Sequence, residues 1–144
     1  MRHLLFATAA LLGAPALAAP VVTDWHAEGR AIYAHAISVP TVAGRGQTPA
    51  LAAWLKERFA AGGLTDAVIK PYDGEAALIL RWKAEGTPVK KPVLLLAHMD
   101  VVEAKAEDWS RDPFKLVEEG GYFYGRGTID DKQGVTAVTT ALLR

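Results

Sequence analysis

The spacing of apolar residues along the chain predicts two helices in its first half. Apolar positions recur at helical intervals over residues 25–39, with Asp24 placed to cap the first turn and Pro40 to end the helix. A second amphipathic stretch follows Thr48, a candidate N-cap, and Pro49, which suits the first helical position. We therefore expect two helices separated by a short loop.

Strand-like patterns follow these helices. Residues 67–72 and 76–83 favour two strands, the second with alternating apolar and polar positions. Residues 92–97 (PVLLLA) are uniformly apolar, as in a strand covered on both faces in the middle of an α/β sheet. We predict a three-layer α/β unit with this segment as its central strand, and ligands bind beyond the carboxyl ends of such strands.

The last third of the chain predicts a hairpin, a turn and a helix. A short hairpin is expected around residues 115–124, a glycine-bracketed turn at residues 125–127, and a helix over residues 132–144. The final helix has an apolar face but no glycine or asparagine to cap its end. We expect a chain cut short within its domain, and a natural C-terminal helix is the alternative.

The first 18 residues have the composition of a secretory signal peptide. A positive start at Arg2 precedes an apolar run over residues 4–14, and Ala16-Leu17-Ala18 fits the small-residue cleavage pattern. The run is too short for a membrane span, so no stable membrane insertion is expected. A buried N-terminal helix is the alternative. Export places the mature chain, residues 19–144, in the periplasm or outside the cell.

Composition excludes several kinds of function. The chain has 16 Lys and Arg against 16 Asp and Glu, so it lacks the positive field that nucleic-acid binding needs. It has no cysteine, so a transition-metal site would have to use histidine and carboxylate ligands. Ser38 and Ser110, the serines after the signal segment, lie outside any G-x-S-x-G elbow, which argues against a serine hydrolase.

His98 and Asp100 form the first candidate site, directly after the apolar segment. Side chains alternate along a strand, so these two residues share one face and Met99 points to the other. One imidazole nitrogen could bind a metal while the other donates to the carboxylate, which would fix the tautomer. A purely structural histidine at the end of a strand explains the pair equally well.

The second candidate site is the segment from Gly125 to Lys132, GRGTIDDK. Its glycines permit a sharp turn that brings Asp130 and Asp131 together just before a helix. Adjacent carboxylates are tolerated in water, at a helix N-terminus or around a cation. Helix capping alone would account for one of them. We predict that His98 and Asp130 converge closely enough for one metal ion to touch both.

Three motifs in this order resemble one enzyme family. LLLAHMDVV, then W-x-x-D-P-F from Trp109, then YGRGTIDDKQG are similar to the N-terminal part of the di-zinc exopeptidases and deacylases. That family includes acetylornithine deacetylase, succinyl-diaminopimelate desuccinylase, carboxypeptidase G and the aminoacylases. Glu103 departs from the pattern, since many members have proline there, but it should not touch the metal site.

The resemblance assigns roles to three residues of this sequence. It implies that His98 is a ligand of the first zinc, that Asp130 bridges two zincs, and that Asp100 orients His98 and supports catalysis. Asp131 would be structural, and the Asp130–Asp131 peptide would be cis. His26 and His35 lie on opposite sides of the first helix and are expected to be surface residues rather than ligands.

The implied protein is a zinc-dependent hydrolase of amide bonds in peptides or N-acyl amino acids. It would have a three-layer αβα zinc-exopeptidase-like fold and two zinc ions, with cobalt or manganese as alternatives, and it could form a homodimer through a lid domain. Residues 19–144 would supply only the N-terminal part of the catalytic domain, and we expect this part to be inactive alone. The alternative is a non-catalytic α/β binding module of the same fold.

Overall fold

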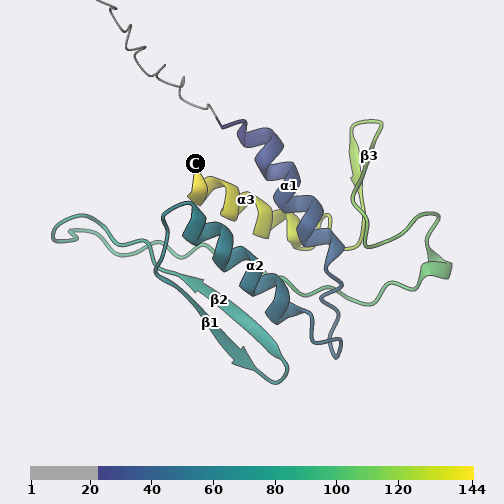
Figure 1. Cartoon of the computed structure of the whole chain (residues 1–144), viewed down its shortest axis with the longest axis horizontal. Helices are drawn as coiled ribbons and strands as arrows, with labels where there is room; N and C mark the ends of the chain where they lie inside the picture. The colour runs from purple at the N-terminus through teal and green to yellow at the C-terminus, as the bar shows by residue number, and fades with distance from the viewer. Residues whose placement is uncertain (1–22) are drawn as a thin grey trace, which may run out of the picture.

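Three helices form one layer of the molecule (Figure 1). The computed structural model describes residues 23–144, so the predicted signal peptide lies outside the described residues. The helices are α1 (Trp25–Ser38), α2 (Thr48–Ala61) and α3 (Lys132–Leu143), and α3 contacts both of the others. Among the described residues, no helix is both long and apolar enough to cross a membrane.

The helix ends follow local chemistry, with one difference from the sequence prediction. Asp24 caps α1 as expected, because its carboxylate accepts from the backbone N–H groups of His26 and Ala27. Thr48 was predicted to cap α2 but is instead its first residue. The reason is that Gln47 already has helical dihedral angles and its carbonyl accepts from the N–H of Leu51 at 3.2 Å.

Two antiparallel hairpins accompany the helices. β1 (Ala67–Tyr72) pairs with β2 (Glu75–Leu80), and β3 (Val117–Glu119) pairs with β4 (Tyr122–Tyr124). A two-residue turn closes each hairpin with positive φ at both positions, Asp73-Gly74 in the first and Gly120-Gly121 in the second. The prediction for β1 is confirmed, whereas β2 ends at Leu80 rather than Lys83.

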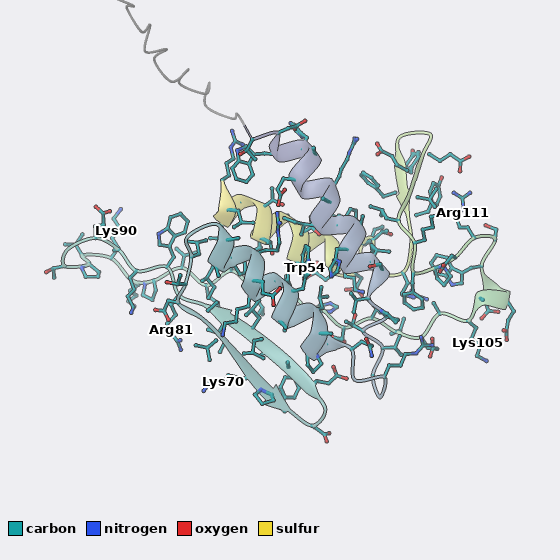
Figure 2. All side chains as sticks on the ribbon, viewed as in Figure 1. Trp54, Lys70, Arg81, Lys90, Lys105 and Arg111 are labelled. Atoms are coloured by element: carbon teal, nitrogen blue, oxygen red, sulfur yellow. The ribbon has the colours of Figure 1, made fainter. Side chains whose placement is uncertain are left out.

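The remaining segments are loops and one short helix. A 3-10 turn, η1 (Ala106–Asp108), lies in the long loop that precedes β3. After β2 the chain runs into an exposed loop over residues 81–92, and Figure 2 shows Lys90 at its tip, away from the helices. These loops carry the chain to and from the segment that contains His98.

A small core lies between the helices. Ile32 and Ala36 from α1, Leu51 and Leu55 from α2, and Val135 from α3 are its buried members. α2 also packs against both strands of the first hairpin, where Leu78 contributes a partly buried side chain to the core. The apolar stripes that predict the three helices are therefore the surfaces by which the helices pack.

The prediction of a buried central strand at residues 92–97 is wrong. This segment has no strand pairing, and Leu94 and Leu96 are 83% and 85% exposed. The strands among residues 23–144 pair only within their own hairpins, so the segment lacks the neighbours that a central strand needs. Within this segment only Ala97 packs against the helical core, and Met99 does so two residues later.

Candidate metal centre

His98 and Asp130 meet at the surface of the molecule. Nε2 of His98 lies 2.8 Å from Oδ1 of Asp130, although 32 residues separate them in sequence. The side chains are 50% and 83% exposed, so both are open to solvent. His98 follows the extended segment that lies on the helices, and Asp130 sits just before α3. The predicted convergence of the two side chains is present.

Asp100 lies on the other side of the imidazole. Nδ1 of His98 is 3.2 Å from the backbone carbonyl oxygen of Asp100 and 3.4 Å from its Oδ1. Met99 points to the core, so His98 and Asp100 share the outer face as the alternation predicts. Both ring nitrogens therefore face acceptors, which fixes the orientation of the ring.

These acceptors make His98 a stronger base. Partial burial is the largest single influence and lowers the pKa of His98, but the hydrogen bond to Asp130, the Asp100 carbonyl and the two carboxylate charges together outweigh it. The net result is a raised pKa. An imidazole between two carboxylates is also a good donor for a metal cation.

Asp131 holds the two parts of the site together. Its Oδ2 accepts from the backbone N–H of His98 at 3.3 Å, and its Oδ1 accepts from the N–H of Gly134 at 3.2 Å, which caps α3. The peptide between Asp130 and Asp131 is cis. Asp131 therefore has the structural place that sequence comparison with the family implies.

The turn that carries Asp130 packs closely against the segment that carries His98. Gly127 has a φ of +89°, and a Cβ there would lie 2.8 Å from Cγ1 of Val101, so only glycine fits. The guanidinium of Arg126 donates to the Glu103 carbonyl at 3.2 Å and lies over the ring of Trp109. The third sequence motif is thus in contact with both of the others.

The donors at this site suit a transition-metal ion but are few. An imidazole nitrogen and a carboxylate oxygen are ordinary zinc ligands. Among residues 23–144, no group of three or more His, Asp or Glu side chains is arranged to hold a metal. The shallow hollow around the pair is lined by His98, Asp100, Val101, Val102, Gly125, Arg126, Gly127, Thr128, Ile129 and Asp130.

The segment that contains this site matches a known protein family. Residues 94–144, which include His98, Asp100 and Asp130, match the family described as Peptidase family M20/M25/M40. The resemblance seen in the sequence motifs is therefore confirmed.

Several M20 relatives and one solved structure are similar to this chain. The human N-fatty-acyl-amino acid synthase/hydrolase PM20D1 is 51% identical over 55 residues, which cover 38% of this chain and 11% of PM20D1. A probable succinyl-diaminopimelate desuccinylase of Staphylococcus aureus (strain Mu50 / ATCC 700699) is 34% identical over 91 residues, covering 62% and 22% of the two chains. The chain thus matches only a small part of these relatives.

A solved structure supports the fold class. The di-peptidase Dug1p from Saccharomyces cerevisiae superposes with a TM-score of 0.69 at 26% identity, covering 83% of this chain and 28% of Dug1p. The predicted α/β zinc-exopeptidase-like class, N-terminal part only, is confirmed by this likeness. The exposed 92–97 segment is the place where the chain departs from the predicted layers.

The histidines of α1 lie away from the His98–Asp130 pair. His26 is exposed, but His35 is partly buried and stacks on Trp54 at a centroid distance of 3.9 Å, in the helical layer where Figure 2 labels Trp54. The expectation that His35 is a simple surface residue is therefore wrong. Its ring has an aromatic neighbour because the side chain of Trp54 on α2 reaches α1.

Two buried polar residues near the site were missed by the sequence reasoning. Thr41 and Lys132 are both fully buried. The Thr41 hydroxyl donates to the carbonyl of Met99, and the Lys132 ammonium donates to the carbonyl of Val39. The signal for Lys132 was its helical spacing of three from Val135, which places it on the buried face of α3.

Proposed function

We propose that the protein that carries this chain is a metal-dependent hydrolase of amide bonds, with His98 and Asp130 among its metal ligands. The observation that carries the proposal is the 2.8 Å approach of His98 Nε2 to Asp130 Oδ1 within the segment that matches the M20 family. The names of the relatives support amide chemistry, since they include a hydrolase of N-acyl amino acids, a desuccinylase and a di-peptidase.

Zinc is the ion that the donor set favours, with cobalt or manganese as alternatives. His98 would bind through Nε2 and Asp130 through its carboxylate, and the family resemblance implies two ions bridged by Asp130. Bound zinc would supply Lewis acidity, which polarises a carbonyl and lowers the pKa of water. A proton and a metal compete for Nε2, so zinc affinity is expected to fall as pH falls.

The other residues of the chain would orient this pair. Asp100 faces Nδ1 of His98 and would keep Nε2 directed at the metal, while the Asp131 carboxylate holds the His98 backbone. The side chain of Asp100 would also support catalysis by stabilising positive charge on the imidazole. A small peptide or an N-acyl amino acid is the proposed substrate, bound in the hollow beside His98.

The chain alone is expected to be a poor enzyme. A catalytic zinc uses three protein ligands and an open position, whereas the described residues bring together His98 and Asp130, with Asp100 occupied in orienting His98. No carboxylate in this set is left to act as a general base, a role worth roughly 10²- to 10⁴-fold. Residues 19–144 should therefore bind zinc weakly and hydrolyse neither substrate class.

An assay on the complete gene product tests the proposed function. Dipeptides and N-acyl amino acids are supplied as substrates, and activity is measured before chelation, after chelation and after addition of Zn²⁺. The proposal expects loss and recovery of activity, and loss in the Asp130→Ala variant. Activity that resists the chelator would point to another hydrolase mechanism. A metal-replete protein with no amidase activity would favour a non-catalytic binding module.

Export remains a prediction that rests on the sequence of residues 1–18. Signal cleavage would release a chain that begins near residue 19, which N-terminal sequencing of the exported protein would detect. We also expect no nucleic acid as a partner, since the charges of the chain balance. A homodimer formed through a lid domain, as the family resemblance allows, would be seen by light scattering of the complete product.

A further inference from the structure

We infer that Thr41 and Lys132 are positioning residues that together set the separation of His98 and Asp130. Both act through residues 39–42, the start of the loop between α1 and α2. The inference rests on the proposed function in treating His98 and Asp130 as the metal-binding pair. It concerns two residues that touch neither side chain of that pair by any hydrogen bond in the structure.

Thr41 holds the segment that carries His98. Its side chain is fully buried, and its hydroxyl donates to the carbonyl oxygen of Met99 at 2.6 Å. The carbonyl oxygen of Thr41 in turn accepts from the N–H of Val101 at 3.0 Å. These two hydrogen bonds hold the main chain on either side of Asp100. They fix the position of His98 and Asp100 relative to the helices.

Lys132 holds the turn that carries Asp130. Its side chain is fully buried, and Nζ donates to the carbonyl oxygen of Val39 at 2.6 Å. The backbone N–H of Lys132 donates to the carbonyl of Gly127 at 3.0 Å, which closes the turn. The turn is therefore tied to a point only two residues before Thr41 in the same loop.

The hydrogen-bonded segments around Thr41 and Lys132 are in direct contact, so they act together. A Cβ on Gly127 would lie 2.8 Å from Cγ1 of Val101 and 3.2 Å from Cδ of Lys132, so the Lys132 stem, the turn and the His98 segment are stacked without a gap. Burial of the Lys132 ammonium costs solvation free energy, so it is a weak source of stability compared with an apolar residue of similar size. Its place is better explained by the position that it gives the turn.

Matched substitutions separate positioning from packing. Thr41→Val removes the hydroxyl with little change in shape, and Thr41→Ser restores the hydroxyl. Thr48→Val is the control, because Thr48 is also buried but its hydroxyl has no hydrogen-bond partner. Lys132→Met removes the hydrogen bond from Lys132 to Val39, and Lys115→Met at an exposed position is its control. Because Thr41 and Lys132 are substituted separately, one variant still tests the inference if the other folds poorly.

The first measurement needs no metal. The ¹⁵N chemical shift of His98 Nε2 in the metal-free chain reports its hydrogen bond to Asp130. We expect Thr41→Val and Lys132→Met to move this shift toward that of free imidazole, and Thr41→Ser and both controls to leave it near the wild-type value. An unchanged shift in both Thr41→Val and Lys132→Met, with folded spectra, would overturn the inference.

Zinc affinity gives the second measurement. In calorimetric titrations with Zn²⁺, Thr41→Val and Lys132→Met should bind roughly tenfold more weakly, as for loss of a residue that orients a ligand, and Thr41→Ser should recover. Equal losses in Thr48→Val would show a packing effect and contradict the positioning role. Absence of zinc binding in the wild-type chain would count against the proposed function instead, and the Nε2 shift would still decide this inference.

Discussion

The imidazole of His98 and the carboxylate of Asp130 lie 2.8 Å apart at the junction of two segments that are 32 residues distant in sequence. One segment is an extended run that lies on the helical layer, and the other is a glycine-rich turn that leads into α3. Asp131 bonds to both segments, since it accepts from the His98 backbone and caps the helix. Asp131 therefore links the two segments that carry the pair.

The pKa of His98 should depend on Asp130 more than on the Asp100 side chain. Burial lowers this pKa, but the Asp130 hydrogen bond leads the interactions that raise it, and the Asp100 contribution includes a backbone carbonyl that substitution leaves in place. In NMR titrations, Asp130→Asn should lower the pKa of His98 more than Asp100→Asn does. A pKa that both variants leave unchanged would contradict the site geometry.

The same shift predicts the sign of a pH effect on stability. Because the pKa of His98 is raised above 6.5 in the folded chain, the folded state binds this proton more tightly than the unfolded state does. The stabilisation is fully present below pH 6.5 and is lost as the pH rises through the folded pKa. Urea unfolding from pH 5 to 8 should show this trend in wild type and a weaker trend in His98→Gln.

Replacement of Gly134 by alanine should destabilise the chain, although Gly134 lies inside a helix. A Cβ there would lie within contact of both carboxylate oxygens of Asp131, which caps α3 and bonds to His98. Gly134→Ala should therefore destabilise the chain by about 1–3 kcal/mol through overpacking and loss of the cap. Urea denaturation measures the change.

Gly29→Ala provides the matched control for Gly134. Gly29 lies within α1, and a Cβ there would meet Thr140 at an ordinary contact distance of 3.4 Å. Alanine should then stabilise the helix by up to about 1 kcal/mol. If the two alanine variants change the free energy of unfolding in the same direction, the crowding at Gly134 is not as the structure shows.

Leucines of the helical layer and of the 92–97 segment should differ sharply in their contribution to stability. Leu51 is fully buried, so Leu51→Ala should cost about 2–5 kcal/mol. Leu94 is 83% exposed, and Leu94→Ala should change stability by less than about 0.5 kcal/mol. A large loss of stability in Leu94→Ala would show that Leu94 is buried, as the sequence pattern predicts.

The lowered pKa of His35 should depend on the burial that Trp54 provides. Burial lowers the pKa of His35, and its ring stacks on the indole at 3.9 Å. Since the folded state favours the neutral imidazole, its contribution to stability falls as the pH drops from 6.5 through the lowered pKa. Trp54→Ala should raise the pKa of His35 in an NMR titration. Trp82→Ala, at a 67% exposed tryptophan, should leave it unchanged.

Local signals in the sequence were sufficient to predict most of the elements. Asp24 marks the start of α1, and β1 and α3 have the predicted limits to within a residue, because capping groups, turn glycines and periodic apolar positions act over a few residues. The convergence of His98 and Asp130 was predicted from burial of the 92–97 strand and from the tight turn at Gly125–Gly127. The two side chains converge although the predicted strand is not buried. Their roles as ligands remain predictions.

Features that depend on distant neighbours were not predicted. The apolar run at residues 92–97 has the composition of a central strand, but pairing depends on strands supplied elsewhere, and among the described residues none lies beside it. Thr41 and Lys132 have ordinary polar side chains, and their burial follows from the packing of the α1–α2 loop against α3. The residues of one segment do not determine which distant segments pack against it.

Calorimetric titration of residues 19–144 with Zn²⁺ shows whether His98 and Asp130 bind a metal ion. We expect weak binding that is lost in both His98→Ala and Asp130→Ala and is retained in His26→Ala, a variant of an exposed histidine on α1. We also expect binding to weaken as the pH falls, because protons compete for Nε2 of His98. Zinc binding that persists unchanged in His98→Ala and Asp130→Ala, or its absence in the wild-type chain, would contradict the assignment of this pair as metal ligands.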